Sequence, residues 1–354
     1  MIIYFIISVC FFLLSFSCFN VNYSSIYSHL DSHSRIRKIA FCCFVLFIIV
    51  GLRGPQIGSD TPAYFYEYNA VVSNIEGYKE VREPGYLLLE YIFSRFSIPW
   101  QLFLVFISAF MAFSLGYYIY KNCINIFLAF FLHMTIGLFL MTLTGIRQSI
   151  AISITILVLD KKNWKYFLGV LVASSFHYSA FIMFPAYCMN FIKYKNKEQL
   201  ILFLMLPPFV RIMSPVFTRM MTLIDLGKYE YYRDSIITIN PLNEVFYWGI
   251  LFVVTILLVT YDNNMSDRDF YNFLGTVISS CIIELSTIEY MFIRVQFYFM
   301  IHYVVLIPNL IQRITEKKYR LLGYWVLFAI SIIFLYLNID GNSMNVEKYL
   351  FFWQ

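Results

Sequence analysis

Two titratable side chains, Arg147 and His177, lie inside otherwise apolar stretches of this 354-residue sequence. A charged side chain at membrane depth costs about 2.5–3.5 kcal/mol on insertion scales, so it persists only where it faces protein or water. The guanidinium group of Arg147 matches the oxygens of a phosphate. The imidazole of His177 could act as a general base or donate a hydrogen bond to a phosphate. Each also has a structural interpretation: Arg147 could pair with a carbonyl, and a buried histidine could simply belong to the core.

Other polar residues that could take part in chemistry lie in the segment 53–97 and near the start of a later apolar run. Asp60 could cap a helix that begins at Pro62, or act as a carboxylate beside Arg53, and both can hold at once. The many tyrosines of this segment suit either the bilayer interface or stacking on sugar rings. Arg294 follows the same logic as Arg147, with Glu284 and Glu289 as candidate partners.

The elements that must position these residues are membrane helices. The sequence is 60% hydrophobic and only 13% charged, and a spanning helix needs about 20 apolar residues. We therefore expect an all-α polytopic integral membrane protein with about 11–12 transmembrane helices, forming a single membrane domain over residues 1–354. The net charge of +5 does not indicate a nucleic-acid partner, because the cations fall between apolar runs. The apolar runs lie at about 2–20, 38–52, 98–120, 124–143, 147–160, 164–192, 199–217, 242–260, 269–287, 291–310 and 320–337.

The lysines and arginines of the short loops predict the orientation. Arg35 and Arg37 should be cytoplasmic, which makes the segment 53–97 external and helical. If the run 164–192 crossed once, the following lysines would lie outside. A hairpin of two short helices that turns near 176–178 removes this conflict and places His177 toward the external face. The alternative is one tilted helix and an imperfect charge rule.

Five short motifs, in this order, resemble one protein family. The sequence is similar to the EpsG-like family of polysaccharide polymerases, which includes Wzy-type O-antigen and capsule polymerases, over about residues 40–310. The motifs are Gly51-Leu52-Arg53, Gly58-Ser59-Asp60-Thr61 with Tyr64, Glu83-Pro84-Gly85-Tyr86, Ile146-Arg147-Gln148 with Ala151, and Phe176-His177-Tyr178-Ser179-Ala180.

The resemblance implies a multi-pass glycosyltransferase of the bacterial inner (cytoplasmic) membrane whose active site faces the periplasm. It would polymerise oligosaccharide repeat units linked to undecaprenyl pyrophosphate, both as donor and as acceptor, for O-antigen, capsule or a similar surface polysaccharide. The implied partners are membrane lipids and a chain-length regulator protein. No cofactor and no metal are expected, since arginines can hold the pyrophosphate.

The site predicted from these residues has two parts. The arginines would hold the pyrophosphate and stabilise its departure, and the general base stays open between His177, Asp60 and Glu83. The catalytic candidates are His177, Arg147 and Asp60, and the candidates for binding pyrophosphate or glycan are Arg53, Arg294, Glu83, Tyr86 and Gln148.

Two other functions remain open at this point. A transporter or flippase of lipid-linked glycans would need a two-sided cavity and often has internal repeats, and the sequence shows no obvious repeat. A membrane O-acyltransferase would also place a histidine in an apolar helix, but it would need a path for an acyl donor.

Overall fold

A computed structural model of the chain describes residues 2–21, 32–79, 82–222, 241–261, 265–289, 291–340 and 344–354. Across these ranges the regular structure is helical, with one isolated antiparallel bridge between Arg53 and Phe351, which confirms the all-α prediction. The chain divides into two compact units, Met1–Phe184 with Thr315–Gln354, and Pro185–Ile314. The expectation of a single membrane domain stays a prediction.

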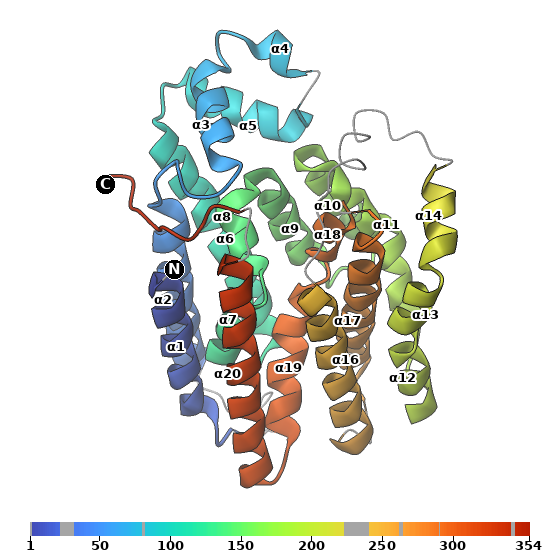
Figure 1. The fold of residues 1–354 in the computed structure, drawn as a ribbon. Helices are drawn as coiled ribbons and strands as arrows, with labels where there is room; N and C mark the ends of the chain where they lie inside the picture. Colours follow the sequence, from blue (N-terminus) through green and yellow to red (C-terminus); the bar gives the residue numbers. More distant parts are fainter. Residues whose placement is uncertain are drawn as a thin grey trace. The chain divides into compact units, whose positions relative to one another are not determined.

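The first unit contains the N-terminal helices, the helices of the segment 53–97 and the long C-terminal helix (Figure 1). Its elements are α1 (Ile2–Ser15), η1 (Phe16–Cys18), α2 (Ser32–Gly51), α3 (Thr61–Ala70), α4 (Ile75–Lys79), α5 (Pro84–Arg95), α6 (Trp100–Asn122), α7 (Ile126–Thr135), α8 (Leu138–Thr144), α9 (Ile146–Val158), α10 (Trp164–Phe176), η3 (Tyr178–Ile182), the first half of α11 (Met183–Ala186) and α20 (Lys317–Asp340).

The second unit consists of helices that follow Phe184 in the chain. They are η4 (Tyr187–Phe191), α12 (Lys197–Leu204), α13 (Leu206–Ile212), α14 (Ser214–Thr222), α16 (Pro241–Tyr261), α17 (Asp267–Ser286), α18 (Phe292–Gln296) and α19 (Ile301–Arg313).

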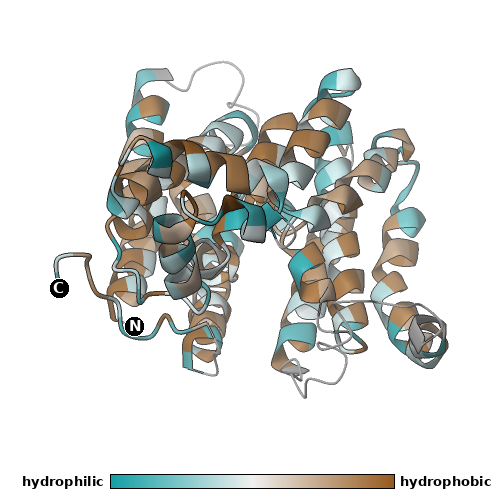
Figure 2. Ribbon diagram, turned by 90° about the horizontal axis from the view of Figure 1, so that it is seen from above, coloured by the Kyte–Doolittle hydropathy of each residue, from teal (hydrophilic) through white to brown (hydrophobic). Residues whose placement is uncertain are grey.

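Three described helices are long and apolar enough to cross a membrane: α6, the Leu242–Tyr261 part of α16, and α20. The 23 residues of α6 extend over about 34 Å, enough for a hydrocarbon core of about 30 Å. Hydrophobic residues recur along the helices of both units (Figure 2), and many of them are exposed. The prediction of a polytopic membrane protein is confirmed, and the number of about 11–12 crossings stays a prediction.

One predicted apolar run, 124–143, forms two helices with a sharp bend between them. Helices α7 and α8 meet at an angle of 58°, and the break falls at Gly137, whose φ of 99° is left-handed and favours glycine. The side chain of Asn125 caps α7, and its amide also donates to the carbonyl oxygen of Ser15 (3.0 Å) and to the hydroxyl of Tyr324 (2.6 Å). Asn125 therefore ties α7 to α1 and α20.

The chain reverses direction at His177, as the hairpin interpretation predicts. Helix α10 ends at Phe176, and the hydroxyl of Tyr166 near its start donates to the carbonyl oxygen of Met183 at 2.6 Å. The returning arm consists of η3 and the short α11 instead of a second long helix. Pro185 lies in this arm, and a proline has no N–H and clashes with the preceding turn, which disfavours a continuous helix.

The loop between α2 and α3 is fixed by the C-terminal tail. The amides of Gly54, Gly58 and Ser59 donate to tail carbonyls at 2.7–3.0 Å. Gly58 has a φ of 96°, and a Cβ at this position would lie 2.1 Å from the carbonyl oxygen of Leu143, so only glycine fits. The tail and the end of α8 thus hold the loop that carries Arg53 and Asp60.

Candidate active site

Two side chains from distant parts of the sequence, Arg147 and His177, meet at the carboxylate of Glu83. Glu83 is separated by 64 residues from Arg147 and by 94 residues from His177. One oxygen of Glu83 lies 2.9 Å from Nδ1 of His177, and the other forms an ion pair with Nη1 of Arg147. The exposed fractions of the side chains are 6% for Glu83, 12% for His177 and 16% for Arg147. The cluster is therefore largely shielded from water but not sealed.

The sequence around Glu83 explains how it reaches His177. Pro84 starts α5, where a missing N–H costs nothing. A Cβ on Gly85 would lie 2.3 Å from Oγ and 2.9 Å from the carbonyl oxygen of Ser175. Glycine at this position lets the first turn of α5 contact the end of α10. Glu83 and His177, each two residues from that contact, lie side by side as a result.

Arg147 is held from a second direction by the helix α3. It is the second residue of α9, whose N-cap is Gly145. Its Nε donates to the hydroxyl of Tyr64 at 3.2 Å, and its guanidinium lies 5.6 Å from the centre of the Tyr64 ring. The Tyr64 ring in turn packs edge-on against Tyr86, with 5.7 Å between ring centres. Four helices, α3, α5, α9 and α10, thus converge on this site.

The charges of the site set the protonation of Glu83. Burial by itself would raise the pKa of Glu83, but the hydrogen bond with His177 and the positive charge of Arg147 outweigh burial and lower its pKa to about 2. Glu83 is therefore ionised at neutral pH. In the neutral imidazole of His177 with Nδ1 donating to this carboxylate, Nε2 carries the lone pair and can accept a proton.

A second carboxyl nearby, that of Glu90 in α5, has a raised pKa instead of a lowered one. Glu90 is almost fully buried. Burial raises its pKa to about 7, although the Tyr86 hydroxyl and the positive charges of Arg82 and Arg147 act in the other direction. A strongly acidic carboxyl, Glu83, therefore lies directly before α5, and a carboxyl that titrates near neutrality, Glu90, lies about two turns later within it.

The predicted residues Arg53 and Asp60 lie on the loop before α3. Arg53 is fully buried, and burial lowers its pKa to about 10, against the influence of Tyr349, Tyr4 and Tyr86. Asp60 is exposed, accepts a hydrogen bond from Ser59 (3.0 Å) and makes no side-chain cap to α3. Within the described residues no ion pair joins Asp60 to Arg53. The roles of both residues stay predictions.

The remaining predicted residues divide between the two units. Gln148 and Tyr86 are buried in the first unit next to Arg147 and Tyr64, and their contact with a substrate stays a prediction. Arg294 lies in α18 of the second unit, so its role beside Arg147 also stays a prediction. Glu284, a candidate partner of Arg294, forms an ion pair with Arg211 at 3.9 Å.

Two residues of the site were not among the sequence-based candidates for chemistry. Tyr64 appears in the family motif but nothing in its spacing predicts a hydrogen bond to Arg147. Glu90 was detectable, because positions 83, 86, 87 and 90 fall on one face of the helix predicted to begin at Pro84.

The model of the EpsG family matches residues 36–351. No curated protein and no solved structure matches the chain. The family match includes every residue of the cluster around Glu83, and it confirms the resemblance seen in the sequence motifs. Because it covers most of the sequence, the chain belongs to the EpsG family, a family of Wzy-like polysaccharide polymerases and EpsG-type glycosyltransferases.

Proposed function

We propose that this protein is a glycosyltransferase of the bacterial inner membrane that polymerises oligosaccharide repeat units linked to undecaprenyl pyrophosphate. Family membership supports the class of reaction. The observation that carries the assignment of the site is the Glu83 carboxylate held between Arg147 and His177.

In the proposed reaction, a hydroxyl of the acceptor repeat unit attacks the anomeric carbon of the donor glycan. The bond between that carbon and the pyrophosphate oxygen breaks, and the pyrophosphate leaves with its lipid. The proton of the hydroxyl passes to Nε2 of His177, which Glu83 orients through Nδ1. Glu83 itself is too acidic, with a pKa of about 2, to be the better base.

Arg147 is the proposed partner of the leaving pyrophosphate. A guanidinium carries five N–H donors, and its contacts with Glu83 and Tyr64 use one each. These two contacts hold the group in one orientation before substrate binds, so little reorganisation is needed as negative charge builds up. The aromatic residues of α3 and α5 would then cover the glycan.

The test in cells is the replacement of Arg147 by alanine. We expect loss of the long-chain ladder on a gel and lipid A core carrying a single repeat unit, with normal expression of the protein. The control is Arg95→Ala, which removes an exposed arginine from the end of α5 and should leave the ladder unchanged. A normal ladder from well-expressed Arg147→Ala would exclude the assignment.

A further inference from the structure

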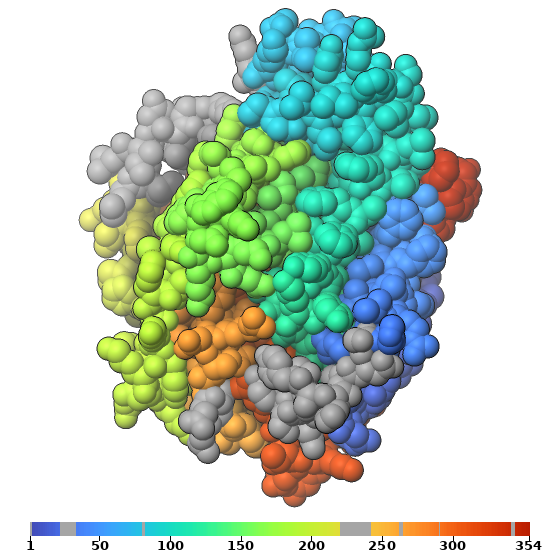
Figure 3. All heavy atoms as spheres, turned by 180° about the vertical axis from the view of Figure 1, so that it is seen from behind, coloured from blue at the N-terminus to red at the C-terminus, as the bar shows by residue number. Residues whose placement is uncertain are grey.

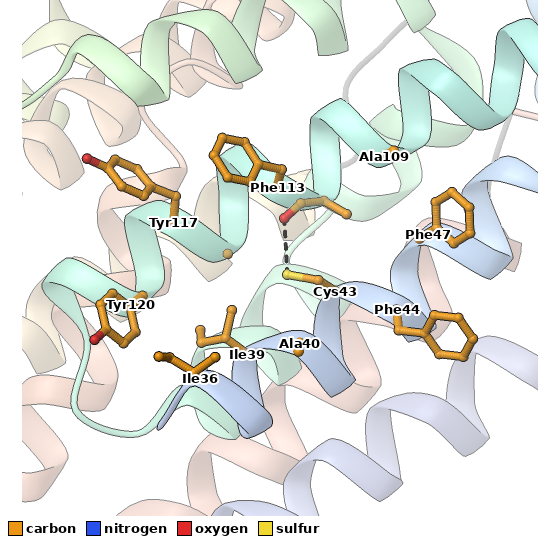
Figure 4. A pocket seen from close by; sticks show the side chains of 12 residues that line it. Ile36, Ile39, Ala40, Cys43, Phe44, Phe47, Ala109, Phe113, Tyr117 and Tyr120 are labelled. Atoms are coloured by element: carbon orange, nitrogen blue, oxygen red, sulfur yellow. Dashed lines mark hydrogen bonds between the residues drawn. The ribbon is translucent and has the colours of Figure 1, made fainter. Parts of the chain in front are cut away.

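Helices α2 and α6 lie next to one another in the first unit (Figure 3), and an apolar groove of about 540 Å³ runs between them (Figure 4). Its floor is narrow, because a Cβ on Gly116 would lie 2.3 Å from Sγ of Cys43. Its walls carry large rings, and Phe44 and Phe113 are about three-fifths exposed. A groove of this shape suits a flexible hydrocarbon chain.

The groove ends before it reaches the loop that carries Arg53. There, a Cβ on Gly51 would lie 2.4 Å from Oγ of Ser108, so the two helices touch. The side chain of Gln101 also donates a hydrogen bond to the carbonyl oxygen of Gly51. An acyl chain therefore cannot enter the groove from a headgroup placed at this end.

The opposite end of the groove, near Ile36 and Tyr120, is cationic. The guanidinium of Arg35 donates to the carbonyl oxygens of Tyr120 (2.7 Å) and Cys123 (3.0 Å), and within the described residues its Nη1 is buried without a hydrogen-bond partner. Nζ of Lys121 lies 4.2 Å from the centre of the Tyr117 ring, which lines the groove. Arg37 is exposed beside Ile36, and neither α2 nor α6 contains an Asp or Glu; Asp31, which directly precedes α2 in the sequence, lies outside the described residues.

We propose that this groove binds an acyl chain of an anionic phospholipid, whose headgroup phosphate contacts Arg37, Lys121 and Nη1 of Arg35. The apolar walls provide contact for the chain, and the cations at the open end provide electrostatic attraction for the phosphate. By the positive-inside rule, this end faces the cytoplasmic leaflet. The lipid is therefore distinct from the glycan-bearing substrate, and the proposal does not depend on the proposed reaction.

The test is native mass spectrometry of the full-length protein with phosphatidylglycerol and phosphatidylcholine that carry identical acyl chains. We expect tighter binding of phosphatidylglycerol to the unmodified protein. In the double variant Arg37→Gln, Lys121→Gln, its affinity should fall about fivefold for each cation removed. The affinity for phosphatidylcholine should fall less, because its choline offsets the charge of the same phosphate. The matched control is Lys162→Gln with Lys165→Gln, which removes two exposed lysines elsewhere and should change neither affinity.

A second variant tests the groove itself. Ala40 lines the groove and is exposed, so Ala40→Phe should fill the groove without disturbing the core and weaken both lipids. If its unfolding temperature changes, Ala109→Phe from the facing helix makes the same test. Equal affinity of the unmodified protein for the two lipids would overturn the proposal, as would an equal loss in the Lys162, Lys165 control.

Discussion

At the scale of single residues, Glu83 orients the side chain of His177 and balances the charge of Arg147. Its carboxylate fixes the orientation of the His177 ring through Nδ1 and neutralises Arg147 in a largely buried setting. Removing one partner of a buried ion pair leaves the other charge buried without compensation. The resulting loss of folding stability is larger than the net stabilisation that the pair provides. We therefore expect substitutions at Glu83 to affect stability as well as chemistry.

The first prediction concerns acid stability. The pKa of Glu83 falls from 4.5 to about 2 on folding, so its contribution to stability is present above about pH 4.5 and is lost as the pH falls toward 2. Between pH 6 and pH 3, the unfolding temperature of the detergent-solubilised protein should fall more than that of Glu83→Gln. Over this pH range the free energy of unfolding should fall by on the order of 1–3 kcal/mol more for the unmodified protein than for Glu83→Gln. Equal slopes for both proteins would contradict it, and the exposed Glu76→Gln should behave like the unmodified protein.

The second prediction concerns Glu90, whose effect on stability changes with pH in the opposite direction. Burial raises its pKa from 4.5 to about 7, so the folded state holds this proton more tightly than the unfolded state and stability falls as the pH rises from about 4.5 through 7. Glu90→Gln should therefore unfold at a higher temperature than the unmodified protein at pH 8, and at about the same temperature at pH 5. Thermal unfolding at the two pH values measures this, and a variant that is less stable at pH 8 would refute the buried neutral carboxyl.

At the scale of elements, the approach of α5 to α10 builds the site. Gly85 permits it, because any Cβ there would meet Ser175. We predict that Gly85→Ala lowers stability by about 1–3 kcal/mol through overpacking and reduces polymerisation by moving Glu83 away from His177. The control is Gly249→Ala, where a Cβ would have nothing within 4 Å. Polymer synthesis and unfolding temperature are measured for both, and unchanged synthesis in a folded Gly85→Ala would show that the contact does not position Glu83.

The elements themselves were largely predictable from the sequence, and the site was predictable in part. Long apolar runs predicted the helices, and the charges of the loops predicted the reversal at His177. The bend at Gly137 and the short pieces around Pro185 were not predicted, because hydropathy does not detect a local change of direction. Arg147, His177 and Glu83 were all named from the sequence. The contact between Arg147 and Tyr64 could not be predicted, because it joins residues 83 positions apart that only the folded structure brings together.

At the scale of the whole molecule, the charges of the loops predict that the segment 53–97 faces the periplasm and the loop after α9 faces the cytoplasm. Cysteine labelling tests this, after the exposed Cys10 and Cys188 are replaced by serine. A membrane-impermeant maleimide should label Tyr66→Cys on α3, a position that is 72% exposed, in spheroplasts. It should label Lys162→Cys only after the membrane is opened. The reverse pattern would invert the proposed topology.

The central claim is that the cluster of Arg147, Glu83 and His177 joins lipid-linked repeat units. Its most direct test is chain growth by the purified protein in liposomes with a synthetic undecaprenyl-pyrophosphate-linked repeat unit as the sole substrate. We predict a ladder of products from the unmodified protein and from Arg95→Ala, and a loss of about 100-fold or more in the rate from Arg147→Ala and from His177→Ala. A full ladder from folded Arg147→Ala, or no chain growth by the unmodified protein, would contradict the claim.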